Sequence, residues 1–343
     1  MNIRRTPASK IRKFILGKIA GHQKDIISIT AEKFGVTRQT VRGHLQKLAD
    51  ENRIVIKGTS RAKTYEVKPL ADIARQMPLT RDLQEDVLWR QHIRPHLQGV
   101  AANIIEICQY GFTEMTNNAI EHSAGRKLSI ALKYTSALIE MRVADNGIGI
   151  FQKIQTALHL DDPIHTILEL VKGKLTTDPE HHTGEGIFFT SRLFDDFAIM
   201  SGNLVFAHRN NKDWRLEDAE TPIKGTMVIL KINPMTKRTA KAVFDRYASE
   251  EDYGFSRTHI PVSLARYGDE NLVSRSQARR LLVRFERFKE IILDFKGITM
   301  VGQAFADEIF RVFAREHPHL HLTPVHANAD IMKMISRAKN AGN

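Results

Sequence analysis

The chain has 343 residues, 42% of them hydrophobic, and a formal net charge of +12. This length allows about two or three domains with apolar cores. No apolar run approaches the ~20 residues that span a bilayer, so we expect a cytoplasmic protein that does not enter a membrane. The single cysteine, Cys108, excludes an internal disulfide and a cysteine zinc cluster, and its apolar neighbours predict a buried thiol.

The first 68 residues contain most of the excess positive charge, with 16 Lys or Arg against 5 Asp or Glu. A helix is expected from Ser9, and a short second helix from Thr30 to Gly35. Thr37 opens a third helix with apolar residues at helical spacing. Residues 54–67 alternate around a glycine turn, which predicts a hairpin.

This order of elements resembles a winged helix-turn-helix domain, with bounds 1–68. In that family the third helix enters the major groove of double-stranded DNA, and basic residues contact the phosphates. Some winged helices dock proteins instead, but the concentrated positive charge favours DNA. The expected DNA-binding residues are Arg38, Gln39, Thr40 and Arg42 on the helix, and Arg61 and Lys63 on the hairpin.

Residues 69–80, which include Pro69 and Pro78, are expected to form a linker. The following segment, residues 80–235, carries four short motifs in a fixed order. An expected helix places Glu114 and Asn118 on one face, because they are four residues apart. The other three motifs are glycine turns beside expected strands or helices: Asp145-Asn146-Gly147-Ile148-Gly149, Gly184-Glu185-Gly186 and Gly225-Thr226.

Together, these motifs resemble the GHKL superfamily, the ATP-binding α/β sandwich of DNA gyrase and the histidine kinases. The resemblance implies ATP and Mg²⁺ as ligands. Asp145 would accept a hydrogen bond from the adenine amino group, and Asn118 would give an oxygen to Mg²⁺. Glu114 would be the catalytic residue, orienting the attacking water. The expected nucleotide-binding residues are Asn118, Asp145, Gly147, Gly149, Gly184, Gly186 and Thr226.

Residues 151–183 would correspond to the family's ATP lid, expected as a long loop. Lys172 and Lys174 lie in this stretch. Either lysine could reach a phosphate or remain solvated.

The last segment, residues 250–343, alternates expected strands and helices, as a small α/β domain does. The stretch from Ile291 to Phe310, with a strand ending at Asp294, resembles the STAS fold of anti-sigma-factor antagonists in its STAS-like variant. The family's phosphorylated serine is absent from the matching turn, Gly302-Gln303-Ala304, and Ser274 and Ser276 are expected to be helix-cap residues. This domain is therefore expected to bind a regulatory protein or another part of the same chain.

The sequence as a whole predicts an α+β multidomain protein. Its expected function is that of a DNA-binding regulator in which a GHKL pocket binds ATP, hydrolyses it, and switches the winged helix and the STAS-like domain. Contacts within one chain or in a homodimer could carry that switch. The alternative is an anti-sigma-type serine/threonine kinase acting on a separate partner. An ATP-driven nucleic-acid machine would need a further module that the sequence does not display.

Overall fold

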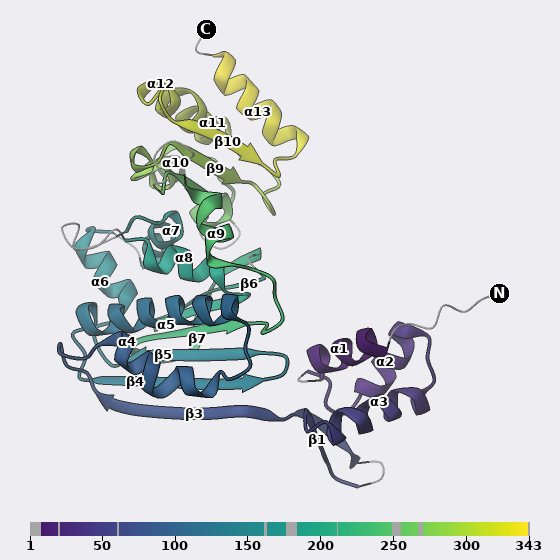
Figure 1. Ribbon diagram of the computed structural model, residues 1–343. Helices are drawn as coiled ribbons and strands as arrows, with labels where there is room; N and C mark the ends of the chain where they lie inside the picture. The colour runs from purple at the N-terminus through teal and green to yellow at the C-terminus, as the bar shows by residue number, and fades with distance from the viewer. Residues whose placement is uncertain are drawn as a thin grey trace.

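The computed structural model describes residues 8–19, 21–59, 62–160, 163–175, 184–210, 212–248, 255–266 and 270–341. It contains helices as well as strands, and the strands form three separate sheets, as expected for an α+β protein (Figure 1). In the described ranges, no helix combines the length and the apolar character needed to cross a membrane.

The N-terminal part, which we call the head (residues 8–67), has a hydrophobic core of its own. Thr37 caps its third helix by accepting a hydrogen bond from the Thr40 amide at 3.1 Å. Val41, Leu45 and other apolar residues of that helix face the core. The elements are α1 (Ala8–Lys18), α2 (Ile26–Phe34), α3 (Arg38–Asp50) and the antiparallel pair β1 (Ile54–Lys57) and β2 (Thr64–Val67).

Two expected boundaries in the head are wrong by about one turn or less. The second helix begins at Ile26 instead of Thr30, because Ile26 is buried and the Ile26–Ile29 stretch continues the helical turn. The first helix already includes Ala8, so Ser9 lies inside it.

The expected linker at residues 69–80 is also wrong. Pro69–Pro78 form β3, an edge strand that pairs antiparallel with β4 (Lys127–Thr135). Prolines are tolerated at the ends of an edge strand, where no neighbouring strand needs their missing N–H groups. The alternating residues Ile73 and Met77 pack against the main core, which is the strand pattern that the prolines obscured.

β3 is the edge of a five-stranded antiparallel sheet with the order β3-β4-β5-β7-β6. We call it the central sheet. Helices pack on one of its faces (Figure 1). Its other strands are β5 (Ile139–Asp145), β6 (Asp196–Arg209) and β7 (Lys212–Ile232), and its helices are α4 (Glu85–Leu88), α5 (Ala102–His122), α6 (Ile150–Ala157), α7 (Pro163–Lys172), α8 (Gly186–Leu193) and α9 (Ala240–Tyr247), with helical turns at Trp89–Ile93 and Arg94–His96.

The C-terminal segment (residues 255–341) forms a parallel three-stranded sheet of order β10-β9-β8. Ser274 caps its first helix in a capping box with Gln277, as expected, whereas Ser276 lies inside that helix. The strands are β8 (Arg257–Pro261), β9 (Glu290–Asp294) and β10 (His321–Val325), and the helices are α10 (Arg275–Leu282), α11 (Gln303–Asp307), α12 (Ala314–Glu316) and α13 (Ala329–Asn340), with turns at Val262–Ala265, Phe285–Arg287 and Glu308–Phe313.

The C-terminal segment and the central sheet share one continuous hydrophobic core. Phe188 of α8 lies 4.4 Å from Phe255 between ring centroids, and Phe255 lies 5.5 Å from Phe288. The head, by contrast, has a separate core. The described residues therefore form two packed units rather than one per sheet.

Candidate functional site

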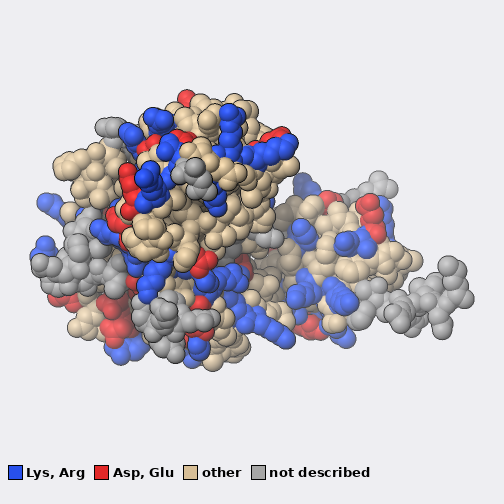
Figure 2. All heavy atoms as spheres, turned by 90° about the horizontal axis from the view of Figure 1, so that it is seen from above, with Lys and Arg blue, Asp and Glu red and all other residues tan. Residues whose placement is uncertain are grey.

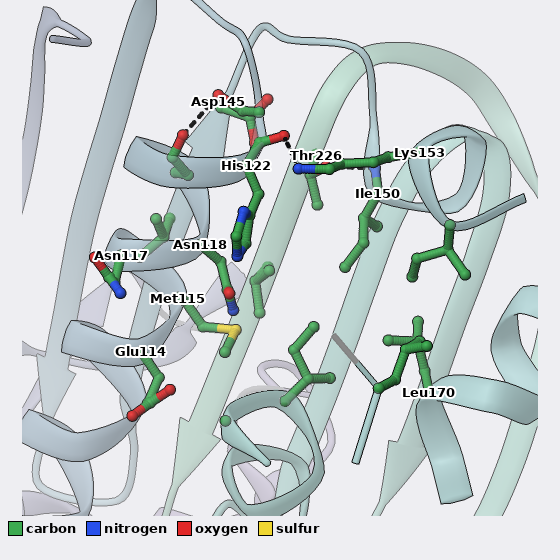
Figure 3. Close-up of a pocket in the computed structure, with 18 of the residues that line it drawn as sticks. Glu114, Met115, Asn117, Asn118, His122, Asp145, Ile150, Lys153, Leu170 and Thr226 are labelled. Carbon is green, nitrogen blue, oxygen red and sulfur yellow. Dashed lines mark hydrogen bonds between the residues drawn. The ribbon is translucent and has the colours of Figure 1, made fainter. Parts of the chain in front are cut away.

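One face of α5 forms a wall of a cavity of about 320 Å³. Glu114, Asn118 and His122, spaced four residues apart, line it (Figure 3). The opposite face of α5 is apolar and includes Phe112, which is fully buried. Cys108 is also buried, as expected, and burial raises the pKa of its thiol. The helix thus presents polar side chains to the cavity because its other face is held in the core.

Asp145 stands at the end of β5, in the upper wall of the cavity in Figure 3. Its Oδ1 accepts a hydrogen bond from the Gly147 amide at 2.8 Å. Burial raises the pKa of Asp145, while hydrogen bonds from the Gly147 and Thr226 amides oppose that rise. The Thr226 hydroxyl accepts a hydrogen bond from the Ile150 amide at 3.0 Å, and this ties β7 to α6 at the same end of the cavity.

Gly147 is not among the residues that line the cavity, whereas Gly149 is. A Cβ at position 147 would lie 1.9 Å from the Ser123 carbonyl oxygen. The close approach that demands glycine here is to the end of α5. Gly147 thus brings the Asp145 turn against the helix that carries Asn118.

Gly184 and Gly186 line the other end of the cavity, at the start of α8. A Cβ at position 186 would lie 2.0 Å from the Glu114 Oε2 atom, so the first turn of α8 packs directly on that carboxylate. Glu185 also lines the cavity, and its pKa is raised by burial and lowered by the charge of Lys174. This end therefore combines two carboxylates with the N-terminus of an eight-residue helix.

Lys153 of α6 lines the cavity and was missed by the sequence reasoning. Its Nζ donates a hydrogen bond to the His122 carbonyl oxygen at 3.0 Å (Figure 3). Burial lowers its pKa, and the Glu121 carboxylate opposes that shift. The sequence offered one signal for Lys153, because it is a basic residue placed one helical turn after the Asp145–Gly149 motif.

The expected long loop at 151–183 is wrong in its described part, which contains α6 and α7. Residues 161–162 and 176–183 lie outside the described residues. Lys172 is fully buried, so it is neither solvated nor in the cavity lining. Lys174 lies over the rings of Phe255 and Phe288. Both lysines are directed to the C-terminal segment, which local sequence patterns could not reveal.

Among the described residues, no cluster of three or more His, Cys, Asp or Glu side chains could hold a metal ion. A Mg²⁺ ion that arrives with a nucleotide does not need such a cluster, because it keeps several waters and binds phosphate oxygens. The one metal ligand expected from the sequence, Asn118, lies in the cavity wall.

A second candidate surface lies on the head. Arg38, Gln39, Thr40 and Arg42 are exposed in the first turns of α3, and Lys63 is exposed before β2. Arg61 lies outside the described residues. Figure 2 shows Lys and Arg side chains exposed on the head and on the C-terminal segment, where acidic side chains lie among them.

In the C-terminal segment, polar groups meet at the carboxyl ends of the parallel strands. Asp294 lies 3.2 Å from His259 Nε2 and 2.8 Å from His326 Nδ1. Burial raises the pKa of Asp294, but hydrogen bonds from His259, the Lys296 amide and His326 prevail and lower it to about 2. The turn that follows leads to Gly302, which precedes α11.

Residues 277–332 match a family model described as a STAS-like domain of unknown function (DUF4325). The match covers β9, β10 and α11, and it confirms the STAS-like resemblance over a shorter span than the expected 250–343. No curated protein matches the chain.

Proposed function

We propose that the chain is an ATP-binding, ATP-hydrolysing regulator of the GHKL type whose winged-helix head binds double-stranded DNA. The observation that carries the proposal is the convergence of four separate motifs on one cavity. Residues from α5, the β5–α6 turn, the start of α8 and β7 meet there: Glu114, Asn118, Asp145, Gly149, Gly184, Gly186 and Thr226. A volume of about 320 Å³ suits a small-molecule ligand.

The residues at the two ends of the cavity fit the two ends of a nucleotide. The half-buried carboxylate of Asp145 can accept the adenine amino group, with Thr226 beside it. Gly184 and Gly186 stand at a helix N-terminus, which attracts phosphate. Asn118 supplies an amide oxygen suited to Mg²⁺, and Lys153 adds a positive charge.

When bound, ATP supplies the phosphoanhydride bond, and Glu114 is the residue placed to orient water for its hydrolysis. Glu114 stands beside the glycine turn of α8, at the end of the cavity away from Asp145. Burial raises the pKa of the neighbouring Tyr110, and the negative charges of Glu114 and Glu185 raise it further. A bound Mg²⁺ ion and the backbone of the glycine turn would offset the negative charge of these carboxylates, so that the phosphates can approach them.

The pocket is tested by nucleotide binding and turnover in the full chain. Asp145→Asn should abolish ATP binding, whereas Asp218→Asn, an exposed position on β7, should not change it. Glu114→Ala should bind ATP but release no phosphate, with the exposed α5 residue Glu106→Ala as its control. Unchanged ATP affinity in Asp145→Asn would show that the pocket assignment is wrong.

The same assay with γ-labelled ATP separates hydrolysis from the alternative function, an anti-sigma-type serine/threonine kinase that acts on a separate partner. Free phosphate that disappears in Glu114→Ala supports hydrolysis. Label retained on this chain or on an added protein supports a serine/threonine kinase.

The head is tested by duplex DNA binding at several salt concentrations. Arg38→Ala combined with Arg42→Ala should weaken binding by at least ~10-fold, since each base-edge arginine contact is worth about 1–3 kcal/mol. Arg315→Ala, an exposed residue of the C-terminal segment, is the control. Affinity should fall steeply with salt. Equal affinities of the double variant and the wild type would exclude α3 as the DNA-reading helix.

A further inference from the structure

A buried group of charges joins α7 to the C-terminal segment. Lys172 is fully buried and lies 2.5 Å from Glu169, through Nζ and Oε1. Its Nζ also donates to the Val283 carbonyl oxygen at 2.7 Å, just past the end of α10. Arg284 donates to Glu169 Oε2 at 2.9 Å. A buried charge removed from its partner is costly, so these groups resist separation.

Arg284 also holds the backbone that follows α7. Its Nη2 donates to the Gly173 carbonyl oxygen at 3.4 Å and to the Lys174 carbonyl oxygen. Arg287 donates to the same Lys174 carbonyl oxygen at 3.2 Å, and Lys174 Nζ donates back to the Arg287 carbonyl oxygen at 2.9 Å. Two arginines of the C-terminal segment thus fix the chain at residues 173–174.

The fixed backbone leads directly to the cavity. Leu175, the next residue, lines the cavity, and its amide donates to the Gly184 carbonyl oxygen at 3.2 Å. Gly184 begins the glycine turn that packs against Glu114. The path from Arg284 to the cavity therefore ends at the glycine turn, and Asp145 and Thr226 lie at the other end.

The conformation of Arg284 supports a specific role for its side chain. Its φ is +64°, in the left-handed region that a residue with a Cβ rarely adopts. That conformation is energetically costly for most residues, because the Cβ comes too close to the following carbonyl oxygen. The contacts of the guanidinium with Glu169, Gly173 and Lys174 offset the cost and aim the group at α7.

We infer that Arg284 is a positioning residue for the phosphate-binding turn, through which the STAS-like segment controls how the cavity holds nucleotide phosphates. The inference rests on the proposed nucleotide function and adds a regulator to the same site. Arg284 acts through residues 173–175 and Gly184, and it does not line the cavity. A partner that shifts the turn after α10 would change phosphate binding and leave adenine recognition intact.

The test variant is Arg284→Asn, because asparagine tolerates the left-handed conformation and lacks the guanidinium. Lys172 and Glu169 remain paired with each other in this variant, so no single buried charge is left alone. The matched control is Arg279→Asn, in the preceding helix α10. The Arg279 side chain is 69% exposed and pairs with Glu308 at 2.6 Å. Arg284→Lys is the conservative variant.

Calorimetric titrations with ATP, ADP and adenosine give the decisive comparison. Arg284→Asn should weaken ATP and ADP binding by about 10-fold. The loss of one charge-assisted hydrogen bond changes a dissociation constant by roughly this factor. Adenosine affinity should stay unchanged, Arg284→Lys should recover part of the loss, and Arg279→Asn should match the wild type. A merely structural role would weaken adenosine as much as ATP, and that result would overturn the inference.

Hydrogen–deuterium exchange on the protein without nucleotide gives a second, independent readout. Amides of residues 172–175 and 184–188 should exchange faster in Arg284→Asn than in the wild type and in Arg279→Asn. Suppose that the wild type binds ATP but Arg284→Asn shows unchanged exchange or unchanged ATP affinity. That result overturns the positioning role of Arg284 and leaves the proposed nucleotide binding standing. If the wild type binds neither adenosine nor ATP, the proposed function fails and this role fails with it.

Discussion

The two ends of the chain relate to the central sheet in opposite ways. The head keeps its apolar residues in a core of its own and receives one partly buried side chain, Ala137, from the turn between β4 and β5. Only Lys68 separates β2 from β3, the edge strand of the central sheet. The C-terminal segment, in contrast, continues the core of the central sheet through Phe188, Phe255 and Phe288.

A cooperative folding unit therefore need not coincide with a single sheet. The cavity is built on the central sheet, yet the C-terminal segment is packed into the same unit and reaches residues 173–174 with hydrogen bonds. Among the described residues, the head is joined to the central sheet through β3 and through the Ala137 contact. Units with separate cores open separately, so we expect the head to melt independently of the rest.

Truncation gives the largest expected effect. A chain that begins at residue 69 keeps the whole main core, and it should unfold in the same main calorimetric transition as the full chain. A chain that ends at residue 248 loses Phe255 and Phe288 and exposes Phe188, so it should lose cooperative unfolding and bind a hydrophobic dye. A sharp transition in this second fragment would contradict the shared core.

A pair of single substitutions makes the same distinction within the intact chain. Phe188→Ala should cost about 3–5 kcal/mol in the main transition, because it leaves a cavity between α8 and the C-terminal segment. Leu45→Ala should cost about 2–5 kcal/mol in the head transition alone. Differential scanning calorimetry reads both, and movement of the two transitions together in either variant would show that the units are coupled.

The polar cluster of the C-terminal segment predicts a pH dependence. The folded-state pKa of Asp294 is lowered from 3.8 to about 2, so its stabilisation is present above 3.8 and is lost as the pH falls toward 2. The free energy of unfolding of Asp294→Asn should therefore fall less steeply than that of the wild type in this range. Urea titrations at successive pH values measure this, with exposed Asp330→Asn as the control. Parallel pH curves for Asp294→Asn and the wild type would refute the shift.

The smallest expected effect is confined to the head. Thr37→Ala removes the side-chain cap of α3 and should cost about 1 kcal/mol. The head transition should move to a lower temperature while the main transition stays in place. A shift of the main transition would mean that α3 contributes to the larger unit.

Local patterns in the sequence were sufficient for several features. Thr37 and Ser274 were identifiable as helix caps because capping depends on residues three positions apart. The four motifs around the cavity could be picked out for a similar reason, since each is a short helical face or glycine turn. The STAS-like resemblance rested on one strand and the turn after it, and the matched span contains both.

The features that the sequence did not predict depend on contacts between distant residues. Lys172 is a charged residue at the end of an amphipathic helix, and it is buried where it meets the distant residues Val283 and Phe285. β3 gained its strand conformation from pairing with β4, against the local signal of Pro69 and Pro78. Tertiary pairing overrides propensity most easily where the local signal is weak or mixed.

The single residue between β2 and β3 has a consequence for how such a chain could evolve. A genetic crossover near Lys68 would exchange one N-terminal head for another without disturbing either hydrophobic core. The incoming head would have to keep the spacing to β3, because a slip of one residue turns every side chain of a strand to the opposite face. The described residues from 255 onward share the core of the central sheet, so the pocket and the STAS-like segment would be inherited together.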